Sequence, residues 1–191
     1  MSRKSTSMQC LGLICESKAM DERLIMERAE SLLKLYRHIA SVVLADTEMT
    51  VNESSTYYAG NDTFVEDIKA GLSYLADFEP VNKIQDFEAK VVSLFETEWL
   101  IELMHIALER VRGYLGKDGG KYYDILFKSY FDNHEYTTDE LFDIVGIART
   151  TFFKKRREAI LLFGIYFWGY GIPDLYRGLF GGDSEYERKA D

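Results

Sequence analysis

Apolar positions along the chain recur at intervals of three and four residues, which is the period of an amphipathic helix. This pattern predicts one long helix over residues 21–45 and a second over residues 61–78, capped by Asn61 or Asp62 and stopped by Pro80. Residues 46–62 are rich in Thr, Ser, Asn and acidic side chains and are predicted to form a loop. Between residues 81 and 115 the apolar stripe shifts once, so one curved helix or two consecutive helices would fit equally well.

The chain from residue 116 onward begins with a glycine cluster, GKDGG, that ends the preceding helix and supplies a flexible connector. Three further helices are predicted after it, over residues 122–131, 138–145 and 149–167, the second capped by Thr137 or Thr138 with an imperfect capping box. No stretch alternates convincingly with period two. We therefore predict an all-α protein with an N-terminal helical region (residues 1–116), a C-terminal three-helix domain (residues 117–170) and a tail (residues 171–191) that forms a short amphipathic turn followed by disorder.

The composition is that of a compact, soluble chain. Of the 191 residues, 47% are hydrophobic and 14% aromatic, so enough apolar area can be buried to offset the entropy of ordering, which excludes disorder as the main state. The longest apolar stretch, residues 160–168, is about half the roughly 20 residues that a membrane span requires. The apolar patch at residues 11–15 is too short for the core of a signal peptide, so we expect a cytoplasmic protein without a membrane partner.

Side chains that carry metal or redox chemistry are few and scattered. Cys10 and Cys15 lie in no ligand or redox spacing and are interpreted as reduced structural thiols. The histidines bring no companions at ligand spacing, and acids close to one of them are expected at a helix start from the helix dipole alone. We predict no cofactor, no metal site and no catalytic residue, and hence no enzyme. No metal or catalytic role is predicted for the candidate residues His38, His105, His134, Asp139, Glu140 and Asp143.

The charge is distributed unevenly, and this changes what the net value of −9 implies. Residues 1–120 carry a net charge of −7, whereas residues 121–170 are neutral. Within the neutral block, the nine residues 149–157 hold five basic side chains and no acidic one. This run is the one concentrated positive patch in the sequence, and the acidic N-terminal part opposes nonspecific binding to a polyanion.

The three residues before this basic run have the chemistry of a helix-turn-helix connection. Gly146 can adopt a left-handed conformation, Ile147 can anchor the turn apolarly and Ala148 is small. In projection, one side of the last helix is mainly apolar and is predicted to pack on the two preceding helices. The residues of that side are Phe152, Arg156, Ala159 and Phe163, and their predicted partners are Leu126, Leu141, Ile144 and Ile147.

The opposite side of the same helix is a cationic, hydroxyl-bearing surface at the helix N-terminus, where helix-turn-helix proteins place their groove contacts. Arg149 and Lys154 suit phosphates or guanine edges. Thr150 and Thr151 suit phosphates or a thymine methyl group. Phe153 borders this face and can contact a sugar or a thymine methyl, or else belong to the core. The predicted DNA-binding residues are Arg149, Thr150, Thr151, Phe153, Lys154, Lys155 and Arg157.

Four features of this part of the chain follow one another in a recognisable order. They are the aromatic helix KYYDILFKSYF, the T-x-x-E-L-x-x-x-x-G-I turn from Thr137 to Ile147, the run RTTFFKKRREAI from Arg149 to Ile160, and a closing Trp168-Gly169. In these features residues 98–169 resemble the sigma-70 region-4-like helix-turn-helix domain, in the variant found in phage and mobile-element regulators of Gram-positive bacteria, including the autolysin-regulator-like group. The resemblance implies binding to double-stranded DNA in transcription regulation.

Two positions depart from the pattern of that family. Ala148 stands where the family has a serine that caps the recognition helix, and its absence forfeits about 1 kcal/mol of capping. Arg156 occupies a position that is usually apolar, so either its stem packs while its guanidinium reaches an acid such as Asp143, or the helix is rotated from the predicted orientation. Nothing in residues 1–95 resembles the promoter-melting helix of complete sigma factors, so a self-sufficient sigma factor is not predicted.

Two functions from different classes fit these observations. In the first, the chain is a DNA-binding transcriptional regulator whose N-terminal part dimerises or contacts RNA polymerase. In the second, it is a protein-binding module or an inhibitor encoded on a mobile element, which uses the helical scaffold and its acidic N-terminal surface. Residues 160–168 are apolar all round the helix and must be covered, either by the chain's own N-terminal helices or by a second copy, so a homodimer that binds two half-sites is one expectation.

Overall fold

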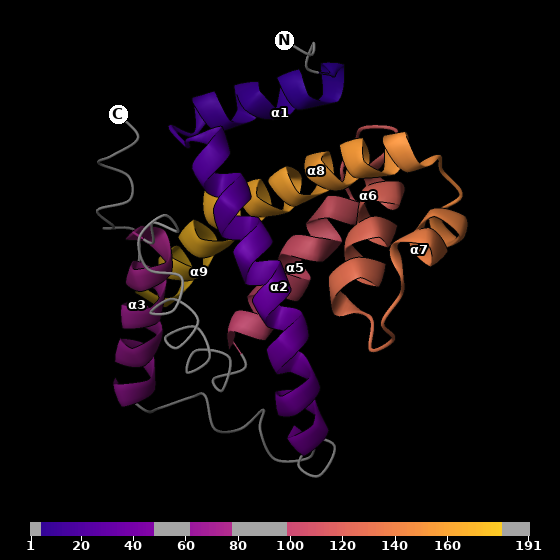
Figure 1. Ribbon diagram of the computed structural model, residues 1–191. Helices are drawn as coiled ribbons and strands as arrows, with labels where there is room; N and C mark the ends of the chain where they lie inside the picture. The colour runs from indigo at the N-terminus through magenta and orange to yellow at the C-terminus, as the bar shows by residue number, and fades with distance from the viewer. Residues whose placement is uncertain (1–4, 48–61, 78–98, 181–191) are drawn as a thin grey trace.

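The computed structural model describes residues 5–47, 62–77 and 99–180, which form a set of packed helices (Figure 1). No strand occurs in these three ranges, which confirms the predicted all-α class. No helix within them is long and apolar enough to cross a lipid bilayer. In chain order the elements are α1 (Thr6–Ser17), α2 (Glu22–Thr47), α3 (Asp62–Asp77), α5 (Trp99–Arg112), α6 (Gly119–Leu126), the π-helical turn η2 (Phe127–Phe131), α7 (Thr138–Val145), α8 (Arg149–Tyr166), the π-helical turn η3 (Phe167–Gly171) and α9 (Ile172–Phe180).

Helices α2 and α3 lie where the hydrophobic pattern predicts them, within two residues at each end. Residues 48–61 of the predicted loop and residues 78–98, with Pro80 and the start of the third helical pattern, lie outside the described residues. Helix α5 covers the later part of that pattern. The hydrophobic side chains that α2 and α3 bury, among those whose burial is described, recur at three and four as predicted; they are Ile25, Ala29, Leu32, Leu33 and Tyr36 on α2, and Ile68, Leu72 and Leu75 on α3.

Helix α1 was not predicted, although its signal is present in the sequence. Ser5 is its N-cap, and the Ser5 side chain accepts a hydrogen bond from the Met8 backbone N–H at 3.2 Å. Met8, Leu11 and Cys15 follow at helical spacing and are all buried. The region we interpreted only as a failed signal peptide is therefore a short amphipathic helix that packs on α8.

Helix α8 is the element around which the others are arranged. It crosses the molecule in Figure 1 and packs against α1, α2, α5 and α6. It meets α2 at Gly164, where an added Cβ would lie 2.6 Å from Cγ2 of Ile25. Because a side chain there would collide with α2, glycine at this position lets the two helices meet. Helix α7 lies beside the N-terminal end of α8, while α3 and α9 lie at the other end.

The apolar surface of the second half of α8 is covered by other helices of the same chain. Residues 158–165 are all buried within a single chain, under α1, α2, α5 and α6. The cover is therefore the chain's own helices, and this segment does not require a second copy. One core contains residues from both sides of the glycine cluster at residues 116–120, among them Leu32 and Phe163; the division into two parts there stays a prediction.

The predicted tail needs a correction. Residues 172–180 form the helix α9 rather than a short turn, and Ile172 is buried. Helix α9 packs against α3 and η3, so an amphipathic stripe that is too short to be stable alone is held by tertiary contacts. Residues 181–191, where disorder was expected, lie outside the described residues.

Candidate nucleic-acid interface

The start of α7 is fixed by a complete capping box, where the sequence predicted an imperfect one. The Thr137 side chain accepts a hydrogen bond from the Glu140 backbone N–H, and the Glu140 carboxylate accepts one from the Thr137 backbone N–H at 2.7 Å. The backbone hydrogen bond from Thr137 holds the pKa of Glu140 below its usual value. These reciprocal bonds place the first residue of α7 without ambiguity.

The connection that leads into α7 is held to the rest of the molecule by polar contacts. The Lys128 ammonium donates to Asp132 at 2.6 Å and to the Tyr136 hydroxyl at 3.0 Å. The hydrogen bond from Lys128 is the main reason that the pKa of Asp132 falls to about 2. Arg37 of α2 donates to the backbone carbonyl of Ser129 in η2 at 2.6 Å and to that of His134 at 3.2 Å, and the second bond ties this connection to the N-terminal part.

The turn between α7 and α8 has the predicted conformation. Gly146 has φ 66° and ψ 39°, in the left-handed region that favours glycine, and its N–H donates to the carbonyl of Phe142 at 2.9 Å. Ala148 precedes α8 with an extended backbone and makes no side-chain cap. Helix α8 therefore begins without a side-chain capping bond at its N-cap. We call α7, this turn and the first nine residues of α8 (Arg149–Arg157) the α7–α8 corner.

The α7–α8 corner has a small hydrophobic cluster of its own, formed by Ile125, Leu141 and Phe152, with Ile147 packed against it. Leu126, the other predicted partner, belongs instead to the main core. The prediction that Ile144 packs against α8 is wrong, because its side chain is 48% exposed. It lies one turn after Glu140, so it shares the solvent-facing side of α7 instead of the stripe that carries Leu141.

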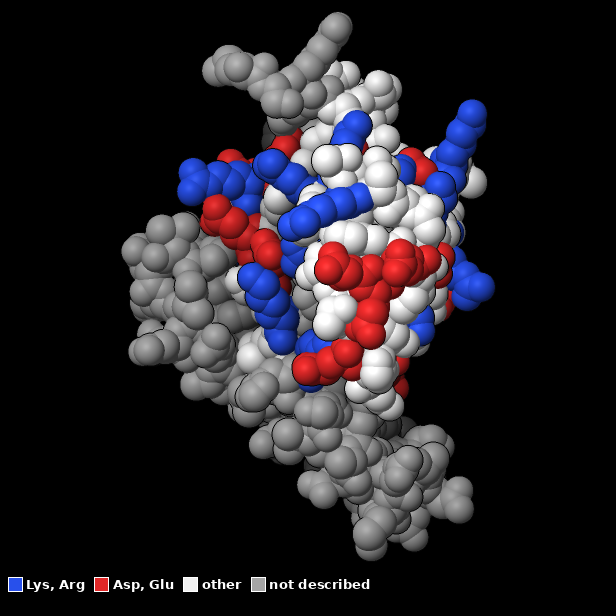
Figure 2. All heavy atoms as spheres, turned by 45° about the vertical axis from the view of Figure 1, so that its right-hand side comes forward, with Lys and Arg blue, Asp and Glu red and all other residues white. Residues whose placement is uncertain are grey.

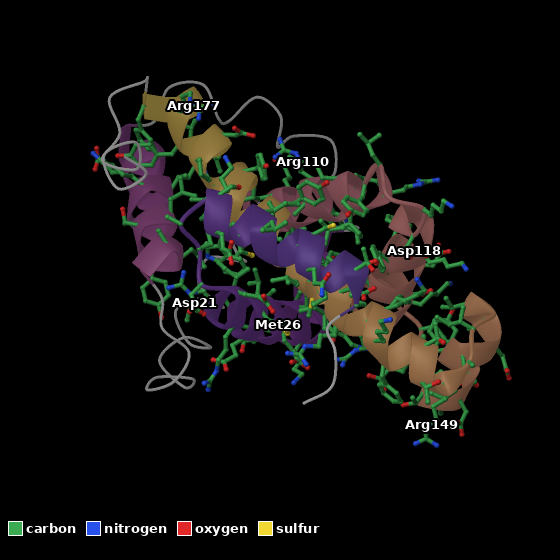
Figure 3. All side chains as sticks on the ribbon, turned by 90° about the horizontal axis from the view of Figure 1, so that it is seen from above. Asp21, Met26, Arg110, Asp118, Arg149 and Arg177 are labelled. Atoms are coloured by element: carbon green, nitrogen blue, oxygen red, sulfur yellow. The ribbon has the colours of Figure 1, made fainter. Side chains whose placement is uncertain are left out.

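The first half of α8 presents most of the predicted DNA-binding residues to solvent. Thr151 and Lys155 are half-buried, whereas five side chains are exposed within an arc of about 140° at 100° per residue. The three exposed cations make no ion pair with any residue that the structure describes. Arg149 stands at one end of the molecule, far from Arg177 at the other (Figure 3). The five exposed residues, which we call the exposed face of α8, are Arg149, Thr150, Phe153, Lys154 and Arg157.

The other two basic residues of the run turn away from this face. The Lys155 ammonium pairs with Asp118 at 2.6 Å and lies over the ring of Tyr122. Arg156 reaches Glu30 of α2 at 3.3 Å and donates to the Tyr130 hydroxyl, not to Asp143. The first interpretation of Arg156, in which its stem packs while its charge finds an acid, is correct in kind, but the acid comes from the N-terminal part.

A buried carboxylate in α8 was missed by sequence reasoning. Glu158 is 3% exposed and accepts hydrogen bonds from the Tyr122 hydroxyl at 2.8 Å and from the Ser5 hydroxyl. Burial, and then the hydrogen bond to Glu158, raises the pKa of Tyr122 above its ordinary value. The one signal in the sequence was a single acid directly before a long apolar stretch. This contact attaches α1 and α6 to the middle of α8.

The surface of α7 differs in charge from that of α8. Asp139, Glu140 and Asp143 are all exposed, and α7 has no basic residue. Figure 2, which brings this side of the molecule forward, shows acidic side chains gathered in one group with basic side chains around it. A polyanion that approaches the exposed face of α8 must therefore avoid the acids of α7.

Comparisons of the chain with protein-family models, with curated proteins and with solved structures found no match. The resemblance to region-4-like domains therefore stays a prediction. Among the described residues, no group of three or more His, Cys, Asp and Glu side chains could hold a metal ion. Cys10 and Cys15 form no disulfide among the described residues; Cys10 is exposed and Cys15 is buried in the core.

Proposed function

We propose that the α7–α8 corner is a helix-turn-helix that binds double-stranded DNA, with the first half of α8 in the major groove, and that the protein regulates transcription. The observation that carries the proposal is the exposed face of α8: three cations without described ion-pair partners and a hydroxyl at the open N-terminal end of a helix. Unpaired cations attract phosphates, and the positive end of the helix dipole adds to this attraction.

The residues of this face divide into two roles. Arg149, Lys154 and Arg157 have free, long side chains suited to phosphates or guanine edges. Thr150, with Thr151 half-buried beside it, suits phosphate oxygens. Lys155 has a smaller role than its position in the run suggests, because Asp118 already neutralises its charge. Three free cations instead of five favour a modest, salt-sensitive affinity.

In a regulator of this kind, the rest of the chain would hold the α7–α8 corner in position. Arg156 links the corner itself to α2, while Arg37 and Glu158 link the segments on either side of the corner to α2 and α1, so the N-terminal part holds α7 and α8 in place. A homodimer with two half-sites, or a contact with RNA polymerase, would place the corner on a regulated promoter. These partners are part of the proposal.

The test uses the full chain and a duplex recovered from a randomised library, measured at two salt concentrations. We expect Lys154→Glu/Arg157→Glu to lose roughly tenfold to a hundredfold in affinity at low salt, and the slope of log affinity against log salt to fall by about two. The matched control is Lys69→Glu/Arg177→Glu, which changes the charge equally; Lys69 contacts Phe180, and both lie on α3 and α9 at the far end of α8.

An equal loss of DNA affinity in both variants would contradict the proposal, because the net charge of the protein alone would then explain the loss. Absence of any enriched duplex would also contradict it. If the wild-type chain instead forms a stable complex with a protein and binds no duplex, the protein-binding module is the correct function.

A further inference from the structure

Phe153 stands out among the phenylalanines of the described residues. It is 45% exposed, whereas the other phenylalanines whose burial the structure describes are buried or half-buried. It belongs to neither the main core nor the small cluster around Phe152. An aromatic ring left partly in water forgoes some of the free energy that burial would give, and its outer surface is available to a ligand.

On the exposed face of α8, the neighbours of this ring are charged and polar. Arg149 precedes Phe153 by four residues and Arg157 follows it by four, so the three lie in one row along the helix. Thr150 and Lys154 form the adjacent row. The ring thus occupies the middle of the face that carries the free cations, with no apolar residue of α8 exposed beside it.

The ring is also held in one orientation. Its centroid lies 5.9 Å from that of Phe142 with the planes at 77°, and 5.7 Å from that of Phe152 at 85°. Phe142 and Phe152 are themselves packed edge to face at 5.0 Å. Edge-to-face contacts of this kind fix the ring, so little conformational entropy is lost when its outer surface meets a ligand.

We propose that Phe153 is a specificity-determining residue that contacts the 5-methyl group of a thymine in the major groove. This inference rests on the proposed function and deepens it. A phenyl ring cannot hydrogen-bond to a base edge, and the thymine methyl is the apolar group that the major groove displays. With Arg149 and Arg157 reaching the backbone or guanines on either side, the ring lies where base edges pass.

A protein partner is the competing occupant of this ring, and the surroundings disfavour it. Protein interfaces centre on clustered apolar side chains with few charges in the middle. Here the centre is a single ring between two arginines. The other exposed apolar residue of the corner, Ile144, lies on the side of α7 that carries Glu140 and does not extend this face.

The experiment compares thymine with uracil, which lacks only the methyl group. In the duplex selected by the full chain, each thymine is replaced in turn by uracil, and affinity is measured for the wild type, for Phe153→Ala and for the matched control Ile144→Ala. At one or two positions we expect uracil to weaken wild-type binding roughly fourfold, the value of one buried methyl group. The same replacement should cost Phe153→Ala nothing, while Ile144→Ala should behave like the wild type.

Each result decides the matter. If uracil costs the wild type and Phe153→Ala equally at every position, or costs neither anything, Phe153 does not read a methyl group, while salt-dependent binding lost in Lys154→Glu/Arg157→Glu would leave the proposed function intact. Loss of all DNA binding in Phe153→Leu, with unchanged thermal stability, would also overturn the inference, because leucine keeps an apolar contact. If the wild type selects no duplex, both proposals fail together.

Discussion

The two halves of α8 are parts of one uninterrupted helix with opposite environments. Residues 149–157 expose three cations, a threonine and a phenylalanine, whereas residues 158–165 are buried on all sides by four other helices. The change occurs within one turn, between Arg157 in water and Glu158 in the interior. The exposed face of α8 therefore belongs to the same helix as the central core residues. Core packing, rather than a linker, sets the orientation of this face.

Two phenylalanines ten residues apart give the largest expected contrast between these halves. Phe163→Ala removes a ring that is 0% exposed and should lower the free energy of unfolding by about 3–5 kcal/mol. Phe153→Ala removes a ring that is 45% exposed and should cost about 1 kcal/mol or less. Urea unfolding followed by circular dichroism measures both. Similar losses would mean that the first half of α8 is also core.

The polar contact at the boundary should have the next largest effect. Tyr122→Phe leaves the buried Glu158 carboxylate without one of its donors and should cost about 1–3 kcal/mol at neutral pH. Because burial raises the pKa of Tyr122 in the folded state, its contribution is fully present below pH 10.0, the ordinary value, and is lost as pH rises beyond it. Unfolding measured from pH 8 to pH 11 should therefore show a shallower alkaline loss in Tyr122→Phe; an unchanged slope would exclude this origin.

The turn that orients α7 against α8 should contribute less. Gly146→Ala forces a Cβ into a backbone with φ 66° and should cost about 1–2 kcal/mol, although nothing would collide with the added atom. Gly120→Ala is the matched control, since it also meets no neighbour but lies in α6 without a positive φ. It should be neutral or stabilising. Equal thermal shifts in the two variants would show that backbone conformation at Gly146 is not the cause.

The acids of α7 should have the smallest effect, and on binding rather than on stability. Asp139→Asn/Asp143→Asn removes two charges next to the exposed face and should raise affinity for a nonspecific duplex roughly twofold to threefold at low salt, with the gain lost at high salt. Fluorescence anisotropy at both salt concentrations measures it. A gain that persists at high salt would point to a changed structure instead.

Local chemistry made much of the corner predictable. The capping residue Thr137, the left-handed Gly146 and the ends of α7 depend on neighbours a few residues away, so the sequence carries their signals directly. The exposed face of α8 followed from helical periodicity and the basic run. Ile144 was placed wrongly because a helix of eight residues buries a narrow stripe, and periodicity alone does not give its width.

The long-range partners could not be predicted. Arg156 meets Glu30, which is 126 positions away in the chain, and Glu158 meets Ser5 across 153 positions. Such pairs depend on how α1 and α2 cross α8, which one sequence without the fold does not specify. Lys155, a predicted DNA-binding residue, likewise pairs with a residue distant in sequence, Asp118.

The glycine contact between α8 and α2 bears on how this protein can evolve and be engineered. Gly164 packs against Ile25 of α2 and residues 158–165 are buried, so core contacts, rather than the side chains at the solvent-facing positions 149, 150, 153, 154 and 157, set the orientation of α8. Under the proposed function, exchanging these five side chains would change the preferred DNA sequence while the buried half of α8 keeps its packing.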